Sequence, residues 1–364
     1  MDPKIKVLQF SNNIEVRLGG PSAVVTGILR VFEEKFDHQL VVFGKIDQIL
    51  PRVIQVKTVR NNHYGFFWGA IPARIREFIT AADIILLHQI YSYSNLLILL
   101  SAKKKKIIFM PHGTFEIYQQ NKSRIRKYIF DAILEFLARN CEISYIVATE
   151  SEQFGVISKF PSRQVSTVGI GIDVPVTIHP KKVSNGSLLC LSRITEKKRI
   201  DICIGALSHL NLDSDNSYVL NIAGQGDELL KSKLIKLAET LKVSSEVNFL
   251  GLLVGNEKWN AINDASILLL PSMNENFAVS VAECISVGVP VIVSKNVALH
   301  TFVKKFNCGI VINELTDKEV SSAVKNIEKN YQNYVNSCIS ASEHLSWNSV
   351  GSKWIDALES KVAR

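Results

Sequence analysis

The sequence predicts an α/β protein built from two Rossmann-like domains in tandem, each a doubly wound parallel sheet. A chain of 364 residues is longer than one hydrophobic core usually supports, so two domains are expected. Short runs rich in Val, Ile and Leu alternate with helical patterns, and many are apolar on both faces, as parallel strands covered by helices are. The series restarts after VTIHPKKVSNGS (176–187), which we interpret as an interdomain linker because it is polar and contains a proline.

The predicted strands are spread evenly over the two halves. In the first half they are Lys6–Phe10, Gln39–Phe43, Asp83–Leu87, Lys106–Met110, Tyr145–Ala148 and Val165–Val168. In the second half they are Leu188–Leu191, Tyr218–Ala223, Glu246–Leu250, Ile267–Leu270, Pro290–Ser294 and Gly309–Ile312. The predicted domains are residues 1–175 and 188–340, joined by the linker 176–187, with a C-terminal helix in 341–364 that crosses back to the first domain. Ligands of such sheets bind at the carboxyl ends of the strands, so we expect function in a shared cleft.

Composition excludes several classes of protein. With 47% hydrophobic and 21% charged residues the chain is neither disordered nor fibrous. The N-terminus has no apolar signal core with a cleavage site, so no secretory leader is expected. Six cysteines lie far apart without a C-x-x-C pair, which argues against a zinc site or a disulfide scaffold and suits reduced cytosolic thiols.

Positive charge is concentrated in the first half of the chain. The net charge is +8, and residues up to Asp173 hold 22 Lys and Arg against 15 Asp and Glu. The excess lies mainly in Lys103–Lys106 and in KSRIRK (Lys122–Lys127). A solvated basic face explains this excess of positive charge, and a face that binds an anionic surface is the alternative. No nucleic-acid module accompanies the basic runs, so a bilayer surface is favoured over nucleic acid.

One apolar stretch is a candidate membrane-spanning helix. IILLHQIYSYSNLLILLSA (Ile84–Ala102) is 19 residues without Asp, Glu, Lys or Arg, a length that can span a bilayer. However, His, Gln, Ser and Asn fall in its middle, where polar groups are most costly. We therefore predict a buried strand at Asp83–Leu87, a turn, and a short helix at Asn95–Ser101.

Glycines and histidines follow the predicted strands of the first half. Gly19 and Gly20 come after the first strand, where they let a backbone approach a ligand and open a helix whose amides can meet an anion; a plain turn is the alternative. His88 and His112 end or follow later strands. Because His112 is followed by Gly113 at a strand's carboxyl end, we expect it to point into the cleft rather than the core.

In the second half, LCLSRITEKKRID (189–201) is a strand, a turn and a helix. Arg193 and Lys198 lie across that turn and can reach one pyrophosphate, although helix-end charges on a solvated face would look the same. The G-x-G of GQGD (224–227) is weak evidence. DSD (213–215) is similar to the carboxylate pair of metal-dependent sugar transferases, but it lies in a polar turn and is interpreted as turn chemistry.

PSMNENFAVSVAECISVGVP (271–290) places two carboxylates in an apolar stretch. Its predicted structure is a strand, a turn with Glu275, and a helix at Phe277–Val287 with Glu283. At about 1.5 Å rise per residue the two lie on the order of 12 Å apart along the axis. Hydrolytic carboxylate pairs stand roughly 5–9.5 Å apart, so a glycosidase dyad is not expected. The spacing suits an elongated ligand with hydroxyls at both ends and an anionic middle, such as a nucleotide-diphosphate sugar.

Taken together and in order, these motifs resemble the retaining glycosyltransferases of family 4 (glycosyl transferases group 1), which have the GT-B fold. The resemblance runs over nearly the whole chain. It rests on Gly19-Gly20, ADIILLH (82–88), His112-Gly113, Gly171-Ile172-Asp173, Arg193 with Lys198, VNFLGLL (247–253) and the two glutamates of PSMNENFAVSVAEC (271–284). The last, a Glu followed by seven residues and a second Glu, is the most specific of these.

The resemblance implies roles for single residues. His112 and Glu275 are the implied catalytic residues, with His112 beside the transferred sugar and Glu275 stabilising the charge that develops on it. The donor-binding residues so implied are Gly19, Gly20, Arg193, Lys198, Leu252, Asn276, Phe277 and Glu283. Among these Glu283 holds the ribose, and Arg193 and Lys198 neutralise the departing diphosphate, which suits an enzyme without a metal.

The sequence departs from the family pattern at four positions. Ser192 and Arg199 replace glycines around the phosphate turn, Ile170 replaces an Asn, and Ala278 replaces a Gly. The last puts in doubt any contact that needs a positive φ there. None removes a charge that the mechanism uses, so an active enzyme is expected.

We therefore predict transfer of a hexose-type sugar, with retention, from a nucleotide-diphosphate sugar to a glycan or lipid-linked acceptor. The expected pathway is bacterial surface polysaccharide assembly (lipopolysaccharide, O-antigen or capsule). No cofactor beyond the donor and no nucleic-acid partner is expected. The expected location is the cytoplasm, at the inner face of the plasma membrane, through the basic N-terminal domain.

Three alternatives stay open. A nucleotide-sugar epimerase or a sugar phosphorylase on the same fold would turn over without an acceptor sugar or with inorganic phosphate. A nicotinamide oxidoreductase would need G-x-G-x-x-G directly after the first strand of a domain, which the sequence lacks. A non-catalytic glycan-binding protein would bind no nucleotide.

Overall fold

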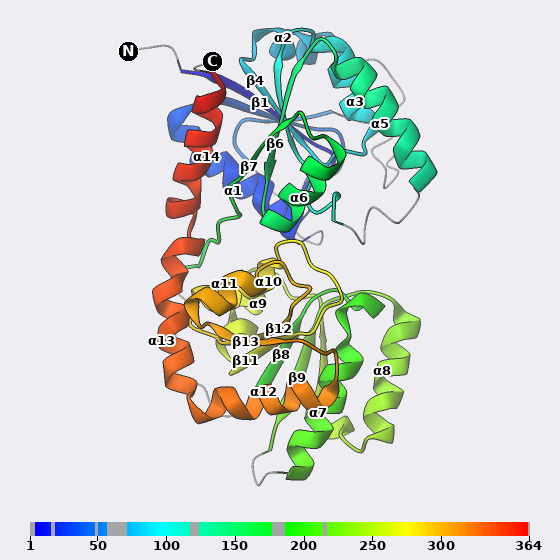
Figure 1. Ribbon diagram of the computed structural model, residues 1–364, viewed down its shortest axis with the longest axis vertical. Helices are drawn as coiled ribbons and strands as arrows, with labels where there is room; N and C mark the ends of the chain where they lie inside the picture. Colours follow the sequence, from blue (N-terminus) through cyan, green and yellow to red (C-terminus); the bar gives the residue numbers. More distant parts are fainter. Residues whose placement is uncertain are drawn as a thin grey trace. The chain divides into compact units, whose positions relative to one another are not determined.

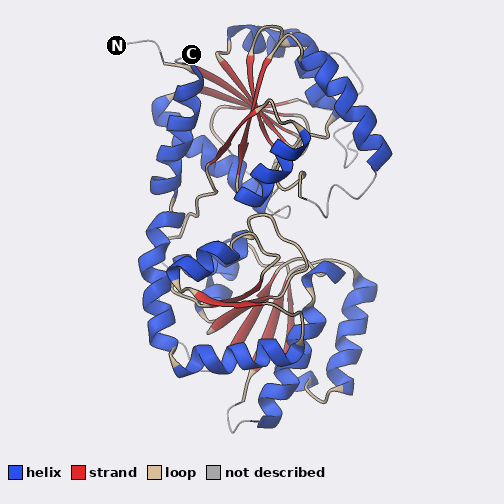
Figure 2. Cartoon of the chain, viewed as in Figure 1, coloured by secondary structure: helices blue, strands red, loops and turns tan. Residues whose placement is uncertain are grey.

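The computed structural model describes residues 4–15, 19–47, 50–56, 71–116, 124–176, 186–213 and 217–362. The chain forms two compact units (Figure 2). The first is Met1–Gly171 together with Trp347–Arg364, and the second is Ile172–Ser346. The units thus divide at 171/172 and 346/347, where the sequence placed the divisions after 175 and near 341. Residues 177–185 of the predicted linker lie outside the described residues.

Within the described residues, the first unit contains a seven-stranded parallel sheet in the order β3-β2-β1-β4-β5-β6-β7 (Figure 1). Its strands are β1 (Lys6–Ser11), β2 (Asp37–Val42), β3 (Val53–Gln55), β4 (Ile84–His88), β5 (Lys106–Met110), β6 (Glu142–Val147) and β7 (Gln164–Thr167). Its helices are α1 (Gly20–Lys35), α2 (Ala73–Ala81), α3 (Tyr93–Ser101), α5 (Arg124–Ala138), α6 (Glu150–Lys159) and α14 (Trp347–Val362).

The second unit contains, in its described part, a six-stranded parallel sheet in the order β10-β9-β8-β11-β12-β13. Its strands are β8 (Ser187–Leu191), β9 (Val219–Ala223), β10 (Val247–Gly251), β11 (Ile267–Leu270), β12 (Val291–Ser294) and β13 (Gly309–Ile312). Its α-helices are α7 (Ile200–Asp213), α8 (Glu228–Thr240), α9 (Gly255–Asn263), α10 (Val279–Ser286), α11 (His300–Phe306), α12 (Asp317–Lys329) and α13 (Tyr331–Ser342). Short 3-10 turns are η2 (Glu196–Lys198), η3 (Ser244–Glu246) and η4 (Glu343–Leu345).

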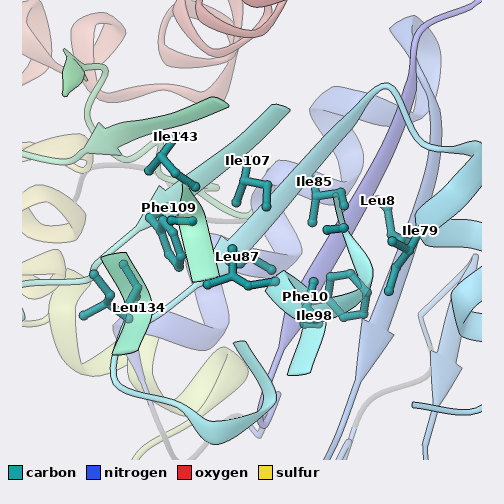
Figure 3. Packing of buried hydrophobic residues seen from close by; sticks show 14 of the residues in the cluster. Leu8, Phe10, Ile79, Ile85, Leu87, Ile98, Ile107, Phe109, Leu134 and Ile143 are labelled. Carbon is teal, nitrogen blue, oxygen red and sulfur yellow. The ribbon is translucent and has the colours of Figure 1, made fainter. Parts of the chain in front are cut away.

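Alternation along the strands builds the core of the first unit. Leu8 and Phe10 of β1 lie on one face of the sheet with Ile85 and Leu87 of β4, because successive side chains of a strand point to opposite faces (Figure 3). The helices α2, α3 and α5 add Ile79, Ile98 and Leu134 to the same cluster. Gln9, between Leu8 and Phe10, is buried on the other face of β1.

Every predicted strand is present, and three have the predicted bounds. The others begin or end up to three residues away, where side-chain pattern defines strand ends least well. The edge strand β3 was not predicted, because it has only three residues and its side chains are half-buried or exposed. Ile84–Ala102 forms β4, a turn and α3, as predicted. Among the described residues, none of the helices is long and apolar enough to cross a bilayer.

In both sheets the order in which strands are added reverses beside the first strand of the unit. In the first unit the reversal lies between β1 and β4, and in the second between β8 and β11. The loops that follow these two strands leave toward opposite faces and open a crevice where ligands of doubly wound sheets bind. The predicted site residues follow these strands.

Candidate functional site

In the second unit an ion pair lies at the point where the strand order reverses. Lys197 and Lys198 form the end of η2, which follows β8, and Glu275 follows β11. Because β8 and β11 are hydrogen-bonded neighbours, their following loops meet at one edge of the sheet. Lys198 Nζ lies 2.5 Å from Glu275 Oε1, and Lys197 Nζ lies 3.5 Å from the same oxygen.

Backbone hydrogen bonds hold both loops. The Met273 amide donates to the Lys197 carbonyl over 2.8 Å, which ties the Glu275 loop to η2. The Glu275 amide donates to the Asn296 carbonyl over 3.1 Å. The Ala298 amide donates to the Glu275 carbonyl over 3.0 Å. The carboxylate is therefore presented from a short parallel bridge rather than from a free loop.

The charge balance of this group favours an anion. Burial lowers the pKa of Lys198 below the ordinary lysine value; the Glu275 carboxylate opposes this shift, and Lys197 and Arg193 add to it. Arg193 is exposed at the carboxyl end of β8. Two lysines thus contact one carboxylate, and the Arg193 charge acts on one of them, a balance suited to a diphosphate. Arg193, Lys198 and Glu275 were predicted from the sequence, whereas Lys197 was not, since one of two adjacent lysines carries no spacing signal.

Glu283 has a different partner. It is buried in α10, and its Oε1 lies 2.5 Å from Lys258 Nζ of α9. Burial raises the pKa of Glu283, and Lys258 acts against this rise. Lys258 was not predicted, because nothing in the local sequence links it to a residue 25 positions later.

The start of α10 differs from the prediction. The helix begins at Val279 rather than at Phe277, and Ala278 before it has φ 59° and ψ 68°. The separation of about 12 Å predicted for Glu275 and Glu283 assumed a helix over the whole interval between them. That premise was wrong, because only the second half of the interval is helical. Because Ala278 replaces a glycine, a positive φ at this position was in doubt; the structure shows that the alanine itself adopts it. Asn276 lies in the turn and Phe277 is buried there.

In the first unit a chain of hydrogen bonds ends at His112. Its Nε2 lies 2.7 Å from Nδ1 of His88, and Nε2 of His88 lies 2.6 Å from Nε2 of Gln9. Oε1 of Gln9 lies 2.9 Å from Nε2 of His38. His38, Gln9 and His88 are buried, while His112 is half-buried. This chain of hydrogen bonds joins β2, β1 and β4 to the turn after β5. Gln9 and His38 were not predicted, since both sit inside strands and read as ordinary core positions.

These contacts set the hydrogens on the rings. The amide nitrogen of Gln9 can only donate, so Nε2 of His88 accepts and Nδ1 of His88 carries the hydrogen. That hydrogen is donated to Nε2 of His112, which leaves the hydrogen of His112 on its Nδ1. Burial lowers the pKa of His112 to about 4 and that of His38 to about 4. Burial, followed by the charges of His112 and His38, lowers the pKa of His88 well below its ordinary value. The chain is therefore neutral at neutral pH.

The turn that carries His112 is fixed from the other side. The Gly113 amide donates to a carboxylate oxygen of Glu152, which is fully buried. Glu152 lies in the first turn of α6, where Thr149 caps its amide over 3.2 Å. His112 itself has φ 54°, a conformation uncommon outside glycine. Such strain persists where the surroundings hold it.

The remaining predicted residues lie at strand ends or helix starts. Gly19 has φ 69° and precedes α1, and its carbonyl accepts from the Ser22 and Ala23 amides. Gly20 is the first residue of α1. Leu252 is exposed directly after β10. Of DSD, Asp213 ends α7, and residues 214–216 lie outside the described residues. Asp227 of GQGD caps α8 by accepting from the Leu229 and Leu230 amides.

Comparison with known families decides what the second unit is. Residues 177–344 match the family described as glycosyl transferases group 1, a range that covers nearly all of that unit. The second unit is a glycosyl transferases group 1 domain. The site with Lys198, Glu275 and Glu283 thus belongs to a glycosyltransferase domain.

Two curated proteins and one solved structure show the reach of the similarity. The O-antigen chain mannosyltransferase RfbU of Salmonella typhimurium is 23% identical over 68% of this chain and 73% of its own length. The uncharacterized glycosyltransferase MJ1607 of Methanocaldococcus jannaschii is 25% identical over 46% of this chain and 43% of its own length. The pneumococcal O-GlcNAc transferase GtfA, solved with UDP and GlcNAc, matches with a TM-score of 0.76 at 12% identity, covering 99% of both chains. The fold is therefore GT-B, as the sequence resemblance implied.

Proposed function

We propose that this protein is a metal-independent, retaining glycosyltransferase that moves a hexose-type sugar from a nucleotide-diphosphate sugar to a glycan or lipid-linked acceptor. The observation that carries the proposal is the contact of Lys197 and Lys198 with Glu275 where the strand order reverses, with the Arg193 charge acting on Lys198. Similarity to an O-antigen mannosyltransferase supports a role in bacterial surface polysaccharide assembly at the inner face of the plasma membrane.

In the proposed reaction the bond between the sugar's anomeric carbon and a diphosphate oxygen breaks, and a bond to an acceptor hydroxyl oxygen forms. Negative charge grows on the leaving diphosphate, and the acceptor proton passes to it. Arg193, Lys197 and Lys198 stabilise this charge, the work that a bound metal would otherwise do. Positive charge grows on the sugar, and the Glu275 carboxylate stabilises it. Retention requires the acceptor to arrive on the face from which the diphosphate departs.

Two further groups orient the donor in this proposal. His112, neutral and with its hydrogen on Nδ1, donates to a hydroxyl of the transferred sugar rather than acting as a cation. Glu283 accepts from the ribose hydroxyls, and Lys258 opposes the rise in its pKa that burial causes, which favours the ionised carboxylate. Leu252 and the loop around it contact the base.

The test begins with the nucleotide. Binding of UDP, GDP and ADP is measured by calorimetry, with UDP first because GtfA was solved with it. Glu275→Gln should lower the transfer rate by about 100- to 1000-fold, the size of losing one charge-stabilising group, and leave nucleotide affinity within a few-fold. Glu257→Gln, an exposed glutamate of α9, is the matched control. A wild-type transfer rate in Glu275→Gln contradicts the assignment.

The same assays separate the alternatives. Lys198→Ala should weaken nucleoside-diphosphate binding at least about tenfold, because a buried charge contact to phosphate is lost. Turnover without an acceptor sugar identifies an epimerase, and turnover with inorganic phosphate identifies a phosphorylase. Activity should survive EDTA; its loss would overturn the metal-independent mechanism.

A further inference from the structure

Helix α5 of the first unit exposes a continuous row of large apolar side chains. Ile125 and Tyr128 are each 78% exposed, and Phe136 is 63% exposed. Ile129 and Ile133 are exposed between them. The intervals of three and four residues place all five on one side of the helix. This α5 face is about 17 Å long, at about 1.5 Å rise per residue. Apolar rows of this size on a folded chain mark binding surfaces.

The opposite side of α5 packs on the unit. Leu134 and Ala138 are buried in the core cluster, and Figure 1 shows α5 beside α3. Both carboxylates of α5 form ion pairs, Asp131 on the buried side and Glu135 with a side chain that is 40% exposed. Asp131 forms an ion pair with Lys159, and Glu135 pairs with Arg163 over 2.9 Å. The α5 face therefore combines exposed apolar groups with carboxylates that are both held in ion pairs.

Cations lie at both ends of the α5 face. Arg124 and Arg126 are exposed in its first turn, and Arg139 is exposed directly after its last. Lys103 and Lys104 join the second end, because the Lys104 amide donates to the Asn140 carbonyl over 2.7 Å. An apolar centre between cationic ends is the pattern of a helix that lies in a membrane interface.

We propose that the α5 face binds the surface of an anionic lipid bilayer. Its isoleucines, Tyr128 and Phe136 enter the boundary between headgroups and acyl chains, and the flanking cations contact lipid phosphates. A second copy of this chain is a poorer occupant, because two such faces bring cation against cation. A nucleic acid is also poorer, since three of the five apolar side chains are isoleucines, which offer bases no stacking surface. The inference does not rest on the proposed transfer reaction, and it accounts for how the enzyme reaches a lipid-linked acceptor.

The test uses the full chain and sedimentation with vesicles. Wild-type protein should bind vesicles of phosphatidylglycerol and phosphatidylcholine, and bind phosphatidylcholine alone far less. Ile129→Ser with Ile133→Ser should weaken binding at least about tenfold, because two groups that enter the apolar layer are lost. Arg126→Glu with Arg139→Glu should weaken it about 25-fold or more, since each cation near an anionic surface contributes about fivefold. Raised salt should weaken wild-type binding in the same direction.

Matched controls lie on α8 of the second unit. Leu229→Ser with Ile235→Ser removes two exposed apolar side chains, and Lys233→Glu with Lys236→Glu reverses two exposed cations. Both controls should bind vesicles within twofold of wild type. As a second readout, Phe136→Trp should shift its fluorescence to the blue on vesicle addition, while the thermal transition of each variant stays unchanged because the altered side chains are exposed.

Three results would overturn the proposal. They are absence of wild-type binding to anionic vesicles, α5 variants that bind as tightly as wild type, and a dimer that Ile129→Ser with Ile133→Ser dissociates without changing vesicle binding. Nucleotide affinity, measured in the same samples, keeps these outcomes separate from a failure of the proposed transfer function.

Discussion

Ala278 holds the turn between Glu275 and α10 in a left-handed conformation. An L-residue with a Cβ pays about 1–2 kcal/mol for that conformation, and glycine does not. The hydrogen bonds that pin Glu275 and the burial of Phe277 supply the compensation. The contacts that position Glu275 therefore determine the conformation of this turn, against the backbone preference of Ala278.

We predict that Ala278→Gly raises the free energy of unfolding of the second unit by up to about 1 kcal/mol, because relief of strain exceeds the added chain entropy. Ala238→Gly, a buried interior position of α8, should lower it by about 1 kcal/mol or more. Urea unfolding of both variants measures the difference. Destabilisation by Ala278→Gly would contradict the strain argument.

The histidines joined by hydrogen bonds in the first unit make stability depend on pH. Their pKa values in the folded chain lie below the ordinary 6.5, at about 4 for His38 and His112. Between these values the unfolded chain binds more protons than the folded chain. The stability that the histidines contribute is therefore fully present above about pH 6.5 and is lost as the pH falls toward 4.

We predict a fall in the free energy of unfolding of the first unit of up to about 1.4 kcal/mol per pH unit for each buried histidine in this window. In His38→Gln the free energy of unfolding should fall less steeply with decreasing pH, by up to about 1.4 kcal/mol per pH unit, because one titrating group is lost. Urea midpoints between pH 7 and 4.5 measure both slopes. Identical slopes in wild type and His38→Gln would show that His38 titrates normally in the folded chain.

At the scale of elements, the first residue of α14, Trp347, places its ring against two glycines of the first unit. A Cβ on Gly27 of α1 would lie 2.1 Å from the Trp347 ring, and one on Gly171 would lie 2.4 Å from it. Gly171 belongs to the Gly171-Ile172-Asp173 motif of the family resemblance. Its absent side chain makes room for Trp347 where the chain leaves the first unit.

We predict that Gly27→Ala lowers the free energy of unfolding of the first unit by about 1–3 kcal/mol, although alanine is otherwise the better helix former. The cause is overpacking against Trp347, so the loss should shrink when Trp347→Leu is also present. Thermal unfolding of the two single variants and the double variant gives this coupling. An additive double variant would mean that the ring does not limit the position.

How well sequence predicted each element follows from how local its signal is. Strands such as Ile267–Leu270 are continuous apolar runs between turn residues, so their bounds were correct. The helix after Glu275 was predicted two residues too long at its start, because nothing in Phe277-Ala278 announces a left-handed residue. The three-residue strand β3 was missed because it pairs at the sheet edge with little apolar pattern.

At the scale of the whole molecule, the first unit is assembled from two distant segments. Trp354 of α14 is fully buried, its ring packs on Phe32 of α1 at 6.3 Å, and its Nε1 donates to the Gly169 carbonyl over 3.3 Å. The second unit is one continuous segment, Ile172–Ser346, with its complete sheet inside it.

A chain that ends at Ser346 should therefore keep the second unit folded and lose stability in the first, where Phe32 becomes exposed. Hydrogen exchange should speed up in β1 and stay unchanged in β8. Equal acceleration in both strands would contradict this division of the chain.

The sequence by itself determined the alternation of strands and helices, the fold, and the glutamate signature with Glu275 in a turn and Glu283 in a helix. These features follow from hydrophobic period and turn chemistry, which act over a few neighbouring residues. Only the tertiary structure decided which charges meet: Lys197 and Lys198 with Glu275, Lys258 with Glu283, and Gln9 between His38 and His88. It also decided that α5 pairs its carboxylates with Lys159 and Arg163 and turns an apolar row outward. The reason is physical, since such contacts depend on strand order, register and packing between segments far apart in the chain.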